Sequence, residues 1–239
     1  MNAMYLPAAP EILESFEYEV RELGGTLRDV YAEGDLLFAR AILPDEMDVR
    51  PGDRVHGGVA VRTHDTEILV HPYTYRVICT NGAITVSSSG SRIVQRVELA
   101  APTIVINSVL DDLREAIHAS GKRPALQATV SAMQSAADRD ANLFIQLMPA
   151  LPHMPPGVRA SVLRTIVRRF EAEGDRSTFG LVNAVTSVAR DTTDPELRWR
   201  LEEVGGGILA HLPAGRPSIV PALDAFETAE PVSAQFASH

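Results

Sequence analysis

Strand-like alternation within residues 55–87 constrains the fold of this chain more than any other feature of its sequence. Side chains with high strand propensity recur at every second position over Val59–Thr63 and again, after a gap, from Ile68 to Val77. Successive side chains of a strand point to opposite faces, so a period of two predicts two extended segments. The polar segment His64–Glu67 between them predicts a hairpin loop.

The rest of the chain divides into a strand-rich part and a helical part. A second predicted hairpin joins Leu27–Tyr31 to Leu36–Ile42, and apolar residues recur at helical spacing from residue 107 onward. We therefore expect an α+β fold, in which an N-terminal antiparallel β-hairpin sheet is followed by a C-terminal helical half. We expect residues 1–106 to form the mainly β region with one N-terminal helix, residues 107–212 to form the helical region packed on the sheet as one domain, and residues 213–239 to form a flexible tail.

Two local predictions concern turns. Pro44–Gly52 is rich in proline and acidic residues and predicts a polar connector. Asn81–Gly82 predicts a turn in which Gly82 has a positive φ, because both residue types tolerate that conformation.

Two sequence blocks carry a family resemblance. The first, Arg76–Gly82, reads Arg-Val-Ile-Cys-Thr-Asn-Gly, and the second combines Phe179–Thr186 with Arg200–Glu202 and Gly205–Gly207. Together they resemble a phage- and plasmid-like bacterial family that carries a domain of unknown function. The resemblance spans roughly residues 55–210 and implies an association with mobile elements. A hairpin sheet followed by helices is also similar, at the level of the fold, to single-strand annealing recombinases of the Redβ and Erf type.

The charge is unevenly distributed along the chain. The net charge is −9, yet residues 1–49 carry −8 while residues 50–96 carry +3, and Lys122 is the only lysine among 22 basic residues. An acidic total argues against a general nucleic-acid binder, whereas the local excess of arginine leaves a basic groove open.

The sequence contains no apolar run long enough to span a membrane and no signal-peptide pattern at its N-terminus. Its one cysteine, Cys79, has no internal partner for a disulfide. We therefore expect a cytoplasmic protein with no membrane partner.

The predicted binding site is an arginine-rich sheet surface. An arginine fork beside backbone N–H groups can hold a phosphate or a carboxylate, and tyrosines can stack on bases. The alternative is structural: the Asn-Gly pair turns the chain, Arg76 pairs with an acid, and the tyrosines are half-buried in the sheet. The candidate residues are Arg62, Tyr73, Tyr75, Arg76, Thr80, Asn81, Gly82, Arg92 and Arg96.

No catalytic, metal or cofactor site is predicted. His56, His64 and His71 lack the spacing of metal ligands, and a buried apolar role is the favoured interpretation of Cys79. Glu202 and Glu203 are interpreted as solvated residues on a helix.

Three functions remain open. The first is a non-enzymatic protein that handles nucleic acid, binding single-stranded DNA or RNA through the sheet, with a role in single-strand annealing and recombination. The second is a self-assembling or protein-interaction module without nucleic acid, which the acidic total favours. The third is an enzyme with an unrecognised site. Hairpin edges and amphipathic helices also predict a homo-oligomer.

Overall fold

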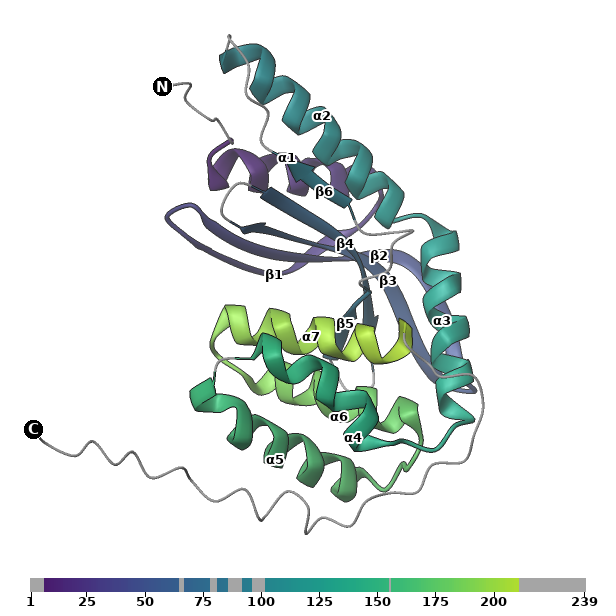
Figure 1. Cartoon of the computed structure of the whole chain (residues 1–239). Helices are drawn as coiled ribbons and strands as arrows, with labels where there is room; N and C mark the ends of the chain where they lie inside the picture. The colour runs from purple at the N-terminus through teal and green to yellow at the C-terminus, as the bar shows by residue number, and fades with distance from the viewer. Residues whose placement is uncertain are drawn as a thin grey trace, which may run out of the picture.

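The computed structural model describes residues 7–64, 67–77, 81–85, 92–95, 102–154 and 156–210. An antiparallel sheet lies between helices on its two faces, as Figure 1 shows, so the predicted α+β class is confirmed. The elements in chain order are α1 (Ala9–Glu22), β1 (Thr26–Glu33), β2 (Leu36–Arg50), β3 (Asp53–His64), β4 (Glu67–Arg76), β5 (Asn81–Ile84), β6 (Arg92–Gln95), α2 (Pro102–Ser120), α3 (Arg123–Ala137), α4 (Leu143–Leu147), the 3-10 helix η1 (Met148–His153), α5 (Pro156–Glu173), α6 (Thr178–Asp191) and α7 (Pro195–Ala210).

The strands follow one another in the sheet in sequence order, β1-β2-β3-β4-β5, and β6 also pairs with β4. Strand β4 is long enough for two partners on the same side: Tyr73–Arg76 pairs with β5, and Glu67–Val70 pairs with β6. Both predicted hairpins are present, β1–β2 and β3–β4.

The predicted connector at Pro44–Gly52 is wrong, because β2 continues through Pro44 to Arg50. Proline cannot donate a hydrogen bond to a sheet ladder, so it is tolerated only where no donor is needed. The β2–β3 register shifts between Ile42 and Glu46, and β1 pairing begins only at Ile42. Pro44 therefore lies at an irregularity where neither neighbouring strand requires its nitrogen.

One face of the sheet is covered by α1 and α2, which lie above it in Figure 1. The alternating residues Leu37, Ala39, Ala41 and Leu43 of β2 face these helices. Their helical partners are fully buried and include Ile12, Phe16, Val20, Leu113 and Ile117.

The opposite face is covered by α7, with α6 beside it and α5 further from the sheet (Figure 1). A cluster of Phe38, Tyr73, Ile84 and Trp199 fills the space between this face and α7. Trp199 is fully buried, so α7 is part of the core and not an appended element.

Candidate functional site

The structure separates the two central arginines of the predicted site. Arg62 pairs across the sheet with Leu69 and Arg76 with Val55, so they lie seven residues apart along the strands, or about 23 Å. Arg62 contacts α7. Arg76 follows Tyr75 directly in β4, so its side chain points to the other face of the sheet from that of Tyr75. These two arginines therefore do not share a groove.

Arg62 is held inside the fold by α7. Its side chain is 10 % exposed, and Nη1 lies 3.3 Å from Oε1 of Glu196. Its guanidinium also stacks 5.4 Å from the centre of the Trp199 ring. Both the charge and the flat face of Arg62 are thus engaged internally.

Tyr73 and Tyr75 face α7 and are buried, with 3 % and 8 % of their surface exposed. Burial raises the pKa of the Tyr73 phenol far above its usual value. Arg28 of β1 lies 5.1 Å from the centre of the Tyr75 ring. The tyrosines belong to the core between sheet and helix, as in the structural alternative.

Arg76 forms a bidentate ion pair at the open end of the β3–β4 hairpin, opposite its loop. Its Nε donates to Oδ1 of Asp53 at 2.6 Å and its Nη2 donates to Oδ2 at 2.8 Å. Asp53 is itself buried. Paired N–H donors on one carboxylate make a strong, directional contact, so this arginine joins the start of β3 to the end of β4.

The predicted turn at Asn81–Gly82 is wrong. Both residues lie in β5, where they pair with Arg76 and Tyr75, and Gly82 is not among the glycines with positive φ. A Cβ at Gly82 would overlap the Tyr73 phenol. Gly82 is therefore required for space beside a buried ring and not for its backbone conformation.

The remaining candidates lie wholly or partly outside the described residues. Thr80, Cys79 and Arg96 are not among the residues that the structure describes. Asn81 lies in β5 and Arg92 lies in β6. The structure describes the backbone of these two residues but not their side chains.

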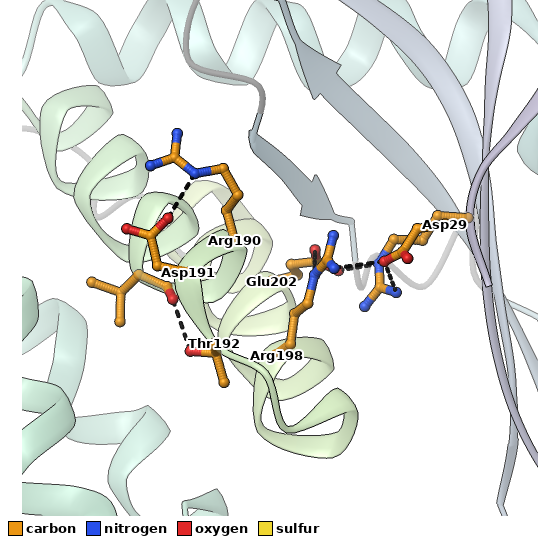
Figure 2. A network of polar contacts seen from close by, with 8 residues as sticks. Asp29, Arg190, Asp191, Thr192, Arg198 and Glu202 are labelled. Carbon is orange, nitrogen blue, oxygen red and sulfur yellow. Dashed lines mark hydrogen bonds and ion pairs between the residues drawn. The ribbon is translucent and has the colours of Figure 1, made fainter. Parts of the chain in front are cut away.

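A buried ionic network joins the sheet to α7 and was missed by the sequence interpretation. Nε of Arg40 lies 2.6 Å from Oε2 of Glu202, and both side chains are 2 % exposed. Figure 2 shows the continuation of this network, in which Arg198 bridges Glu202 and Asp29. Arg198 Nη1 lies 2.6 Å from Asp29 Oδ2. Two arginines thus neutralise two carboxylates between β1, β2 and α7.

Arginines of two neighbouring strands lie close to the ring of Trp199. Arg40 lies 5.3 Å and Arg62 5.4 Å from the centre of its ring. Within the described part of the chain, Arg40 Nη2 and Arg62 Nε have no hydrogen-bond partner. Stacking of a guanidinium on an indole offers these buried N–H groups a favourable contact with the ring face.

Burial shifts the titration of groups beside this tryptophan. It lowers the pKa of His71, whose ring centre is 6.0 Å from that of Trp199, to about 4. It also raises the pKa of Glu202, an effect that Arg40 and Arg198 oppose. The imidazole is therefore neutral near pH 7, and the ionised Glu202 depends on its arginines.

The interpretation of Glu202 and Glu203 as solvated is wrong. Glu202 is 1 % exposed, and Glu203 accepts a hydrogen bond from Trp199 Nε1 at 2.8 Å. The sequence contains one indication of this network: Arg40 is the only charged residue within the apolar run Leu36–Leu43. An arginine in such a strand must be paired if it is buried, but its partner lies 162 positions away.

No metal cluster emerges from the histidines that the structure describes. His56 lies 3.7 Å from Glu46 on the sheet, whereas His71 packs against Trp199. Among the described residues, no group of three or more His, Cys, Asp or Glu side chains is placed to hold a metal ion.

The two sequence blocks of the family resemblance meet in space. Arg76 and Gly82 of the first block line a small hollow together with Phe179, Asn183 and Thr186 of the second. The hollow has a volume of about 10 Å³, room for about one water molecule. The segment Gly205–Gly207, which also belongs to the second block, contributes as well, since Gly206 of α7 packs directly against the Ile84 carbonyl of β5. The blocks thus form one packing unit around the β4–β5 hairpin.

The outer edge of the sheet is open at β1. Its residues are exposed or half-buried along the whole strand, and no other described element pairs with its outer edge. Figure 1 shows the β1–β2 hairpin extending to one side of the molecule. Val30, Tyr31 and, on β2, Leu36 are large apolar side chains that are 39 %, 37 % and 36 % exposed.

Comparisons with protein-family models, with curated proteins and with solved structures find no match for this chain. Within the part that the structure describes, no helix combines the length and the apolar character needed to cross a membrane.

Proposed function

We propose that this chain is a protein-interaction module that docks through the open edge of β1. The supporting observation is the exposure of this edge strand together with the apolar side chains of Val30, Tyr31 and Leu36. A sheet edge offers a row of backbone N–H and C=O groups that an extended segment of another chain can complete. Exposed apolar side chains beside that row add contact area.

The alternative, binding of single-stranded nucleic acid through the sheet, requires accessible arginines and aromatic rings. Arg62 and Arg76 are engaged by Glu196 and Asp53, and Tyr73 and Tyr75 are buried. These contacts favour the interaction module, which also fits the acidic net charge.

Site-specific photo-crosslinking in the cells that naturally make the chain tests the proposal. A benzophenone amino acid replaces Tyr31 on the edge in one variant and Tyr18, an exposed tyrosine of α1, in a matched control. We expect discrete, protease-sensitive adducts from position 31 and none of the same mass from position 18.

Equal adducts from both positions, or no adduct from position 31, would contradict docking at the edge. Adducts that nuclease removes would contradict the interaction module and support the nucleic-acid alternative. An adduct of twice the mass of the chain would identify a second copy as the occupant.

A further inference from the structure

We infer that the occupant of the β1 edge is an extended segment of another protein that carries a lysine or arginine two residues from an apolar side chain. This inference rests on the proposed function and adds the chemistry of the partner. It follows from the charges that remain without a cation along the edge and from the side-chain alternation of β1.

Asp29, Tyr31 and Glu33 share one face of β1, because strand side chains alternate. This assignment agrees with their contacts: Asp29 reaches Arg198, Tyr31 packs against Phe38 of β2, and the Tyr31 hydroxyl donates to Glu33. A partner strand would place its own side chains directly opposite these three.

The acids on this face differ in how they are neutralised. Asp29 is satisfied by Arg198 and Arg40. Within the described ranges, no lysine or arginine forms an ion pair with Glu33, with Asp35 at the end of the hairpin, or with Asp194 before α7. The hydrogen bond to Glu33 raises the pKa of Tyr31, and the charge of Asp194 adds to this effect. Asp194 accepts the backbone N–H groups of Glu196 and Leu197 at the start of α7, so the acids of the edge that have no cationic or helix-end partner among the described residues are Glu33 and Asp35.

The spacing of β1 defines the partner's pattern. A cation opposite Glu33 would form a cross-strand ion pair, and a β-branched or aromatic side chain two residues further on would lie opposite Tyr31. On the other face, Val30 favours an apolar neighbour. The result is an alternating segment with a basic and an apolar residue on the same face.

A second copy of this chain fits the edge less well. Two copies of β1 related by a twofold axis pair residues of equal parity, so the odd-numbered acids face one another or lie diagonally. In the register centred on Tyr31, Asp29 lies directly opposite Glu33. Glu33 would then face a carboxylate that Arg198 already neutralises, so Asp29 offers it no cation.

Amide chemical-shift mapping with three synthetic peptides tests this inference. One peptide carries lysine and valine two residues apart on the same face, with threonine at the positions between them, and its counterparts carry glutamine or glutamate in place of each lysine. We expect the lysine peptide to shift the amides of Thr26–Glu33 and to bind more tightly than both counterparts. Glu33→Lys should weaken it about fivefold, whereas Glu14→Lys, the same charge change on the exposed face of α1, should leave it unchanged.

Equal binding of the glutamine peptide to β1 would overturn the basic pattern while leaving the docking edge intact. Shifts outside β1, equal losses in the two variants, or no binding of any peptide would also overturn the inference. The crosslinks from position 31 decide the proposed function separately from these outcomes.

Discussion

Replacing Glu202 with alanine should lower the free energy of unfolding by about 3–5 kcal/mol, because it leaves a buried arginine without its main counter-charge. Arg40 is 2 % exposed and has Glu202 at 2.6 Å, while its other acidic contact, Asp29, is at 3.4 Å.

The double variant Arg40→Met with Glu202→Leu separates the charge from the packing. It removes one cation and one anion and leaves Arg198 and Asp29 paired at 2.6 Å. Balanced removal of a buried pair is often tolerated, so this variant should be more stable than Glu202→Ala alone. Urea unfolding of the parent, the single variant and the double variant measures the difference.

An exposed pair supplies the control. Glu17 and Arg21 lie 2.9 Å apart on α1 and are 49 % and 71 % exposed. Glu17→Ala should cost only about 0.5 kcal/mol, since solvent screens surface pairs. A loss of less than about 1 kcal/mol for Glu202→Ala would contradict the burial of this network.

Two adjacent glycines of α7 should respond in opposite directions to the same substitution. A Cβ at Gly206 would overlap the Ile84 carbonyl oxygen and lie 2.7 Å from the carbonyl carbon, whereas a Cβ at Gly207 meets nothing within 4 Å. Gly206→Ala should cost about 3 kcal/mol, because the obstacle is the backbone of β5. Gly207→Ala should be neutral or add up to about 1 kcal/mol through helix propensity.

Thermal or urea unfolding of the two glycine variants checks this contrast. The variants have the same composition and differ by one helix position, so their intrinsic helix propensity is matched. Similar stabilities would show that α7 does not approach β5 as closely as the structure indicates.

The division into strands and helices followed from periodicity, because a buried face imposes a period of two on strands and of 3.6 on helices. The β1–β2 hairpin and the helix at Thr178–Asp191 were therefore accessible from sequence. Pro44 concealed the second half of β2, since the bulge that accommodates it depends on the register with β3. The turn predicted at Asn81–Gly82 is wrong for a related reason. Glycine is needed at position 82 because the ring of Tyr73 leaves no space for a side chain, and that contact is not visible in the local sequence.

The sequence could predict which residue types cluster in the candidate site, but not how their side chains are arranged in space. Clustered arginines and tyrosines in residues 50–96 are equally compatible with a binding surface and with a buried charged interface. Their partners, Glu196 for Arg62 and Glu202 for Arg40, lie on α7, more than a hundred residues away. Which charges are neutralised is therefore decided by tertiary contacts that a single sequence does not encode locally.

The central claim is that Arg40, Arg62 and Arg76 of the sheet serve the fold and leave the edge of β1 for partners. Phenylglyoxal modification of the native protein, followed by mass spectrometry of its peptides, tests this claim most directly, because the reagent reacts only with accessible guanidinium groups. The exposed Arg21, Arg54 and Arg123 should react rapidly, whereas Arg40, Arg62 and Arg76 should stay protected until the chain is unfolded. Modification of Arg62 and Arg76 at the rate of Arg123 would contradict the claim and show a sheet surface open to an anionic ligand.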